Sequence, residues 1–474
     1  MKFIDFFSLF CLSMHMQQTS SYLNSVCSTR ISTRLHAGAP LNRRKYLHST
    51  LTLPLTLSLS LSYDVSNSAN ANANALSLPL SLSPPPLSYS PARRSTAYIV
   101  NPTLPPTLNQ LPAMREASKL KSLSKDNTVV LLGSHFSSHY TAQRQQQRFQ
   151  QQQQQQQQQQ DKDAALLLSI IKDILKPRKN KHNANANALA IKFLPTASQP
   201  LLTSFLLDPT ISPTALSNQL VSEHLTPLFT ASDVTSLIPI FTFCRTSGTK
   251  LLATSPPFEA IDRVRMSGLS ALSPSERDAF FVDPAGFANM ITKPVEVEKS
   301  AGEPTLSEND LRRKKFRLYA DYVMTRDFKP ANENDRVSNF FAERCMVDEV
   351  VATNVAQFLT GEEANGKGLV LLLDSICNVE YGAAGGVESR LQRIVDATSK
   401  QEKGKGKGKG KGKVSTASFL INPTARDTLS LGSSQLRLSI GTKPELFDVE
   451  TKVCDFIWFS DVPKINLLNR VMND

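Results

Sequence analysis

The sequence feature that most constrains the fold is a short, unbroken apolar run at Leu369–Leu373. A run of this length, bounded by glycine and polar residues, predicts a strand that is buried on both faces of a sheet. Asp374 and Ser375 follow it directly, and the glycine-rich Gly382–Gly386 comes a few residues later. Ligands of open α/β sheets bind outside the carboxyl ends of strands, so this junction is a candidate site. An ordinary strand–turn–helix joint would show the same pattern.

Other strands and helices alternate with this run along the chain. This alternation predicts an α/β domain of three layers, with a mostly parallel central sheet flanked by helices, from about residue 126 to residue 440. The other predicted strands are Thr128–Gly133, Ala188–Leu194, Thr249–Thr254 and Phe419–Asn422. The predicted helices are Asp161–Leu175, Pro200–Leu207, Pro257–Met266, Pro274–Phe281 and two that begin near Ser307 and Ser338.

Helical periodicity also predicts which side chains of these helices face inward. The buried face of the first helix is expected to contain Leu167, Ile170, Ile171 and Ile174. The helix near Ser307 is expected to bury Leu311, Leu318 and Tyr322, and the helix near Ser338 to bury Phe340, Val347, Val351, Val355 and Phe358.

The net charge of +12 is concentrated outside the predicted domain surface. Residues 1–80 carry six Lys or Arg and two Asp, and the repeat Lys403–Lys413 carries six Lys and no acid, so these two segments hold ten of the twelve excess charges. A basic folded surface is therefore not indicated, and no specific nucleic-acid partner is expected. The Lys-Gly repeat and the polyglutamine run Gln150–Gln160 are interpreted as surface insertions in the domain.

Residues 1–96 have the composition of a targeting leader and linker. A short apolar core near the N-terminus precedes acid-free, Ser- and Arg-rich sequence, and the twin Arg43–Arg44 and the repeat Ala69–Ala75 resemble an export signal with its cleavage site. This order predicts delivery to the plastid (chloroplast), with the thylakoid lumen as a further destination. A Ser/Leu-rich tail that contains these patterns by chance is the alternative. Residues 441–474 are interpreted as a C-terminal extension.

Chemical motifs are few. His135 and His139 follow the first predicted strand, but no carboxylate accompanies them, and a zinc site needs at least three protein ligands. Two solvated loop histidines are the competing interpretation. The six cysteines include no CxxC pair, and the common nucleotide-binding, metalloprotease and serine-hydrolase signatures are absent from the sequence.

Several segments together resemble a known family. Phe241–Gly248, Lys250–Ala253 and Gly268–Arg277 form the most specific block, and Asn378–Gly382 with Arg390 forms the last loop. In this order they resemble the ChaN-like, haem-binding-uptake domain of the Tiki superfamily, in the version found in plant plastid proteins called RETICULATA-related. The final residues resemble the join to those proteins' second region, which would make 441–474 its start.

The resemblance implies haem or another tetrapyrrole as ligand, and membrane association as a further expectation. The chain departs from the family at the chemistry: Ser134 stands where the first loop usually has Glu, Leu194 where the second strand has Glu, and Asn378 where the last loop has His. These departures argue against a metal-activated water. For haem iron, Tyr381, His139 or a Met remains as a ligand. The ligand-binding candidates are His135, His139, Asn378, Tyr381 and Arg390.

Three functions therefore compete. The first is a plastid binding module for haem or another tetrapyrrole, with a degenerate site. The second is a non-catalytic scaffold that keeps the fold. The third is a divergent metal-dependent hydrolase, which would need Asp374 or Glu380 as ligands.

Overall fold

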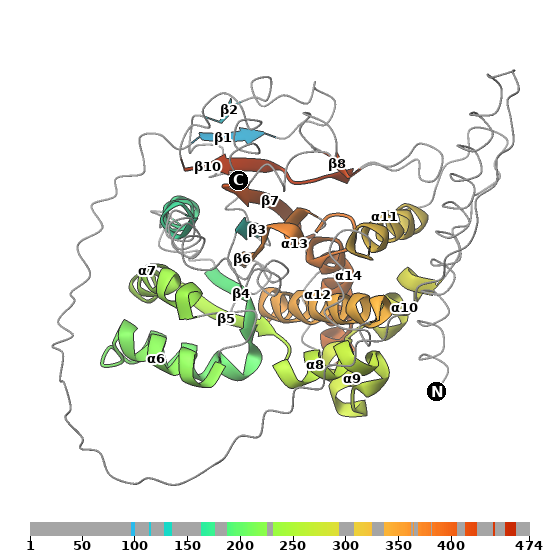
Figure 1. Cartoon of the computed structure of the whole chain (residues 1–474), viewed down its shortest axis with the longest axis horizontal. Coiled ribbons are helices and arrows are strands. Elements are labelled where there is room, and N and C mark those ends of the chain that lie inside the picture. The colour runs from blue at the N-terminus through green and yellow to red at the C-terminus, as the bar shows by residue number, and fades with distance from the viewer. Residues whose placement is uncertain are drawn as a thin grey trace, which may run out of the picture. The chain divides into compact units, whose positions relative to one another are not determined.

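The structure is a computed structural model of the whole chain, and it leaves the leader and the polyglutamine run outside the described residues (Figure 1). His135, His139 and Tyr381 also lie outside them. The described residues are 96–99, 113–114, 128–134, 163–175, 187–224, 231–292, 308–324, 336–361, 364, 368–380, 382–404, 413–423, 439–440 and 451–460.

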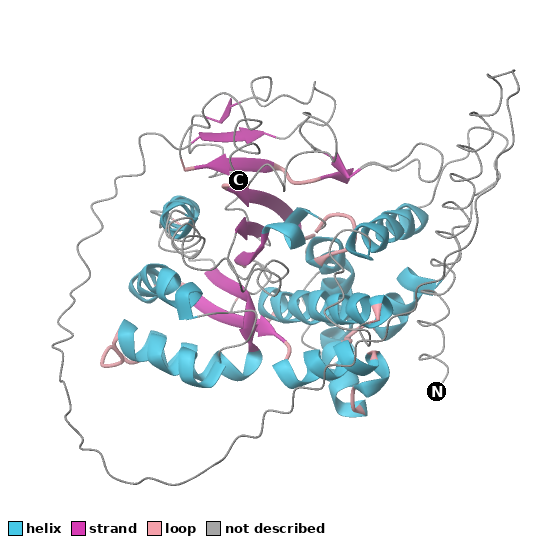
Figure 2. Cartoon of the chain, viewed as in Figure 1, coloured by secondary structure: helices cyan, strands magenta, loops and turns pink. Residues whose placement is uncertain are grey.

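A sheet with the strand order β2-β1-β10-β7-β3-β6-β4-β5 forms the centre of the described part of the chain (Figure 2). The six strands from β10 to β5 are parallel, and β1 and β2 add an antiparallel edge. The strands are β1 (Thr96–Ile99), β2 (Ala113–Met114), β3 (Thr128–Ser134), β4 (Asn187–Pro195), β5 (Lys250–Ser255), β6 (Leu369–Ser375), β7 (Ser415–Ile421) and β10 (Phe456–Phe459). A separate two-stranded ladder joins β8 (Ser439–Ile440) to β9 (Thr451–Lys452).

The three-layer α/β class predicted from the sequence is confirmed, because helices cover both faces of this sheet (Figure 1). Every residue of β3 and of β6 is buried, as expected for strands with two covered faces. Side chains alternate between the faces. Leu189, Ile191 and Leu373 pack on one face in a core with helix 163–174, α5 (Gln199–Leu207), α6 (Pro213–His224) and α7 (Ala231–Ser247).

The opposite face is covered by the long helix α12 (Val337–Thr360), which contacts β5 and β6. It is enclosed by other helices as well as by the sheet, and it buries 16 of its 24 residues, among them Asp348 and Glu349. The helices of this layer are α8 (Phe258–Ser267), α9 (Pro274–Phe280), α10 (Pro284–Thr292), α11 (Glu308–Tyr322), α13 (Ile376–Glu380) and α14 (Val387–Gly404).

Three details differ from the sequence expectations. The sheet continues beyond the expected bounds of 126–440, because β1 and β10 pair with each other and β10 pairs with β7. Leu311 is exposed, since α11 turns Phe316 and Tyr319 inward in its place. Val347 and Phe358 are only half-buried, whereas Phe340, Val351 and Val355 are buried as predicted.

Candidate functional site

Two adjacent strands, β6 and β4, mark a point where the chain's crossovers diverge. After β4 the chain crosses to the neighbouring β5 on one side, and after β6 it passes through α13 and α14 to β7, on the far side of β3. The register places Ile191 beside Leu373, directly before Lys192 and Asp374 near the carboxyl ends of the two strands. Such a divergence leaves a crevice at the strand ends, where open α/β sheets bind ligands. The sequence-selected junction after Leu373 therefore lies where the fold favours a site.

A buried ion network occupies this end of the sheet. Lys192 near the end of β4 and Asp374 near the end of β6 lie on the same sheet face as α12, which supplies Asp348. The ammonium Nζ of Lys192 donates to Asp348 Oδ1 at 2.6 Å and to Asp374 Oδ2 at 2.8 Å. All three side chains are at most 5% exposed. Burial makes each charge depend on the others, because none of them is hydrated by bulk water.

Neighbouring groups fix both carboxylates in place. Asp374 Oδ1 accepts from the backbone N–H of Ser375 at 2.7 Å and from the side-chain amide of Asn378. Asp348 Oδ2 accepts from the Tyr319 hydroxyl at 2.7 Å. Burial opposes ionisation of Asp348, but the charges of Lys192, Arg344 and Arg390 hold its pKa below the usual value. Burial, reinforced by the charge of Asp348, raises the pKa of Tyr319, so the phenol stays a donor.

A second buried network joins α12 to α14. Glu349 accepts from Arg390 Nη1 at 2.8 Å and from Arg393 Nη2 at 2.6 and 2.7 Å. Arg390 is fully buried, donates through Nε to the Gly385 carbonyl at 3.0 Å, and lies over the rings of Phe287 and Phe316. Its guanidinium therefore anchors the glycine-rich loop and α14 onto α12. None of its surface is open to a ligand, which makes its role structural in this conformation.

The glycine-rich loop packs closely against α11. A Cβ at Gly385 would lie 2.5 Å from the ring of Tyr319, so only glycine lets the backbone approach this far. The contact links the loop to the ion network, since the same tyrosine donates to Asp348.

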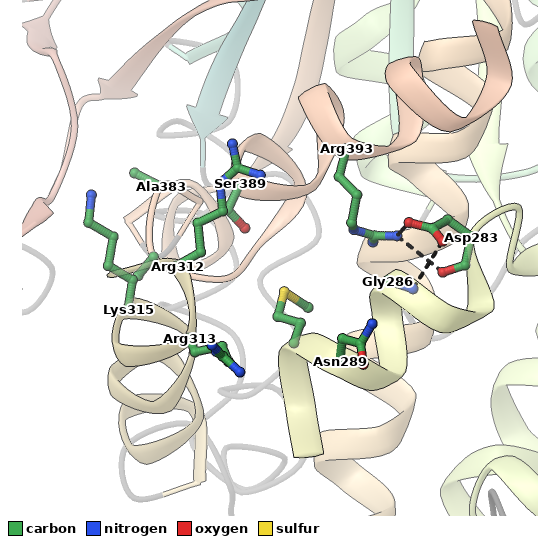
Figure 3. A pocket seen from close by; sticks show the side chains of 11 residues that line it. Asp283, Gly286, Asn289, Arg312, Arg313, Lys315, Ala383, Ser389 and Arg393 are labelled. Carbon is green, nitrogen blue, oxygen red and sulfur yellow. Dashed lines mark hydrogen bonds and ion pairs between the residues drawn. The ribbon is translucent and has the colours of Figure 1, made fainter. Parts of the chain in front are cut away.

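A cavity of about 330 Å³ opens between α10, α11, the loop and the start of α14 (Figure 3). Arg312, Arg313 and Lys315 of α11 form a basic wall, and Arg393 reaches in from α14. Asp283, the one carboxylate among the described lining residues, is held by Arg393 at 3.1 Å and by the Gly286 backbone N–H at 2.9 Å. The remaining lining residues are Gly286, Asn289, Met290, Ala383, Ala384 and Ser389.

The described residues that line this cavity include four cationic side chains and one acid, a composition that favours anions. Arg393 pairs with that acid, and the other three cationic side chains belong to the α11 wall. The larger part of the lining surface is apolar and includes Met290, Ala383 and Ala384, so the cavity accommodates a ligand that also has an apolar body.

The residues selected from the sequence fall into three groups. Asn378 lies at the strand-end site, where it orients Asp374, and Arg390 lies behind the loop as an anchor. His135 directly follows the end of β3 in sequence, but both it and His139 fall outside the described residues. Tyr381 is also outside them, two residues before Ala383, which lines the cavity.

Sequence reasoning missed Lys192, Asp283 and the basic wall of α11. Lys192 lies inside the predicted strand Ala188–Leu194, and a lysine inside an otherwise apolar strand signals a buried partner of opposite charge. The wall was visible as the run Arg312–Lys315 in a helix whose inward face was assigned through Leu311. The sequence pattern does not show that this run lines a cavity, because the other walls of the cavity come from α10 and from the loop before α14.

Comparison with protein families gives a match that covers part of the chain. Residues 156–374 match the family described as "Haem-binding uptake, Tiki superfamily, ChaN". The chain contains a ChaN-like domain. The match spans β4, β5, α12 and β6, and it ends at Asp374, so it includes all three members of the strand-end ion network. The resemblance to the ChaN-like family that the sequence indicated is thereby confirmed.

A solved structure titled "Cofacial heme binding to ChaN of Campylobacter jejuni" is also similar. The likeness covers 77% of this chain and 97% of that chain, at 11% sequence identity and a TM-score of 0.37. A TM-score of this size supports no argument about ligands or residues, so the ChaN-like assignment rests on the family match. A search of curated proteins found no match.

No described helix is both long and apolar enough to cross a membrane. Among the same residues, no group of three or more His, Cys, Asp or Glu side chains is placed to hold a metal ion.

Proposed function

We propose that this ChaN-like domain binds haem or a related tetrapyrrole, with the carboxylates of the ligand in the cavity between α10, α11 and α14. The observation that carries the proposal is the basic wall of α11, which faces the loop immediately after Tyr381 in a domain of a haem-binding family. The strand-end network lies behind this loop and supports it through Tyr319.

The cavity residues fit one edge of a haem. Haem carries two propionate carboxylates on an apolar ring, and the cavity combines Arg and Lys side chains with a lining surface that is mostly apolar. Its volume of about 330 Å³ is near the lower limit for small-molecule sites, which suits the propionate edge of a porphyrin better than the whole ring. Arg312 and Lys315 would hold the carboxylates.

The axial iron ligand is proposed to be Tyr381 or His139, which the sequence indicated, or Met290 in the cavity wall. Tyrosine, histidine and methionine all serve as haem iron ligands in proteins. When bound, the haem would supply a redox-active or Lewis-acidic iron, whereas the chain's own residues bind the carboxylates and orient the ring.

A haemin titration of the intact chain, followed by Soret absorbance, tests the proposed cavity. The wild type is expected to give a saturable Soret shift, and the charge-reversed Arg312→Glu/Lys315→Glu is expected to bind at least about tenfold more weakly, because the variant repels carboxylates. A matched control is Lys172→Glu/Arg336→Glu, which changes one exposed Lys and one exposed Arg outside the cavity lining. Equal weakening in both variants would contradict the assignment of the cavity.

Three single variants identify the iron ligand. Each variant removes one candidate ligand atom: Tyr381→Phe the phenol oxygen, His139→Ala the imidazole and Met290→Leu the thioether sulfur. A displaced Soret maximum in the haemin complex of one variant, with saturable binding retained, would identify that side chain as the iron ligand. An unchanged spectrum in all three would exclude these side chains as iron ligands.

The two competing functions are judged on geometry. A metal-dependent hydrolase would use Asp374, but its carboxylate and that of Asp348 already bind the Lys192 ammonium. Glu380, the other candidate ligand, is buried at the end of α13. A ligandless scaffold remains the function that a negative haemin titration would support.

We further propose that residues 1–96 deliver the chain to the plastid, as their composition predicts, and that the domain is a degenerate, RETICULATA-related version of ChaN. Mapping the N-terminus of the mature protein tests the first part. A start just after Ala75 would support transfer to the thylakoid lumen, whereas a start upstream of Arg43 would contradict it.

A further inference from the structure

A buried ionic contact at the end of the sheet has the form of a cation between two carboxylates. Asp348 and Asp374 come from different elements, α12 and β6, and each turns one oxygen toward the same point. The Nζ atom of Lys192 occupies that point, at 2.6 and 2.8 Å from the two oxygens. Calcium binds carboxylate oxygens at about 2.3–2.6 Å, so the two oxygens need to move only a few tenths of an ångström toward that point to bind a calcium-sized ion, and further for magnesium at about 2.0–2.1 Å.

The surroundings of the two carboxylates also resemble the supports of metal ligands. The oxygen of each carboxylate that does not face Lys192 accepts hydrogen bonds, from Tyr319 on Asp348 and from Ser375 and Asn378 on Asp374. In metal sites, such outer contacts orient the ligating oxygens. Here they hold the two carboxylate groups in alignment in a region with almost no exposure to water.

We propose that Lys192 is a built-in cation, whose ammonium fills a latent site for an oxygen-preferring divalent metal formed by Asp348 and Asp374. The tethered charge stabilises the two acids without a metal and closes the strand-end site to metal-assisted chemistry. Removal of the ammonium leaves two aligned, buried carboxylates with space between them. That arrangement binds Mn²⁺, Mg²⁺ or Ca²⁺, with water as the remaining ligands.

The test compares Mn²⁺ binding to the intact wild type, Lys192→Ala and Lys192→Ala/Asp374→Asn. Free Mn²⁺ is measured by its electron paramagnetic resonance signal, and thermal unfolding is followed with and without Mn²⁺. Lys192→Ala is expected to melt lower than the wild type without metal, and to bind Mn²⁺ about tenfold or more tightly than either other chain, with a saturable rise in Tm. The Lys-Gly repeat and leader are the same in all three chains, so their binding cancels.

Two further measurements keep the test decisive if Lys192→Ala does not fold without metal. The first is refolding: recovery of folded Lys192→Ala with Mn²⁺, but not with Na⁺ at equal ionic strength, would support the proposal. The second uses a variant of matched side-chain volume. Lys192→Gln keeps most of the side chain's volume and removes its charge, so it should also gain Mn²⁺ binding, more weakly. Mn²⁺ binding that is equal in the wild type and in both single variants would overturn the proposal.

Discussion

Neutralising Glu349 should destabilise the domain far more than breaking a surface ion pair. In Glu349→Gln the fully buried Arg390 loses the carboxylate that lies 2.8 Å from its Nη1, whereas Arg393 keeps Asp283 at 3.1 Å. Leaving a buried charge uncompensated costs about 3–5 kcal/mol. Arg390 cannot escape this cost by losing its proton, because a guanidinium stays protonated in proteins. Burial opposes the charge, but the neighbouring acidic groups outweigh burial and raise the pKa of Arg390 above its usual value.

Urea unfolding of the intact chain measures this loss. The control Arg263→Gln breaks the half-exposed pair of Arg263 with Glu276 and should lose no more than about 1 kcal/mol. A double variant, Glu349→Met/Arg390→Met, replaces the pair with apolar side chains and should recover part of the loss, because neither charge is then left alone. A loss for Glu349→Gln as small as that of the control would refute the reasoning.

Three further predictions concern the groups around the site. Burial raises the pKa of Glu388 to about 7 in the folded chain, from about 4.5 when unfolded. The folded state therefore holds a proton that the unfolded state loses, so stability should fall as pH rises from about 4.5 to 7. Glu388→Gln should make the urea midpoint less dependent on pH in this window. Gly385→Ala should lose about 1–3 kcal/mol through its clash with the Tyr319 ring, and should weaken haemin binding by displacing the loop. Tyr319→Phe should lose about 1–3 kcal/mol in urea unfolding, because the buried carboxylate of Asp348 loses a donor, and should leave haemin affinity within about twofold.

Most of the fold could be predicted because local patterns specify it. The apolar run at Leu369–Leu373 is long enough for a buried strand and too short for a helix, and the structure extends it only to Ser375. The helix at 163–174 was predicted from its period, and Leu167, Ile170, Ile171 and Ile174 are all buried.

Elements without a clear local pattern were not predicted. The strand β10 has four residues and becomes a strand only because β7 and β1 pair with its two edges. The helix α7 contains Pro239, which normally signals a helix end, and its burial against the sheet overrides that signal.

The site was less predictable than the fold, because it depends on long-range contacts. The partners of Lys192 are 156 and 182 residues away in sequence, and no periodicity relates them. Asn378 was selected through the family resemblance, yet its contact with Asp374 is local and follows from their spacing of four residues. Arg390 was selected as a ligand residue, although its environment is a buried ion pair.

The most direct test of the central claim is a comparison of haemin with its dimethyl ester as ligands of the intact chain. The ester keeps the iron and the ring but lacks the propionate charges that the α11 wall is proposed to bind. The account predicts a saturable Soret shift with haemin and binding at least about tenfold weaker with the ester. Equal affinity for the two compounds would contradict carboxylate recognition in the cavity, and no saturable shift with haemin would contradict the tetrapyrrole-binding function itself.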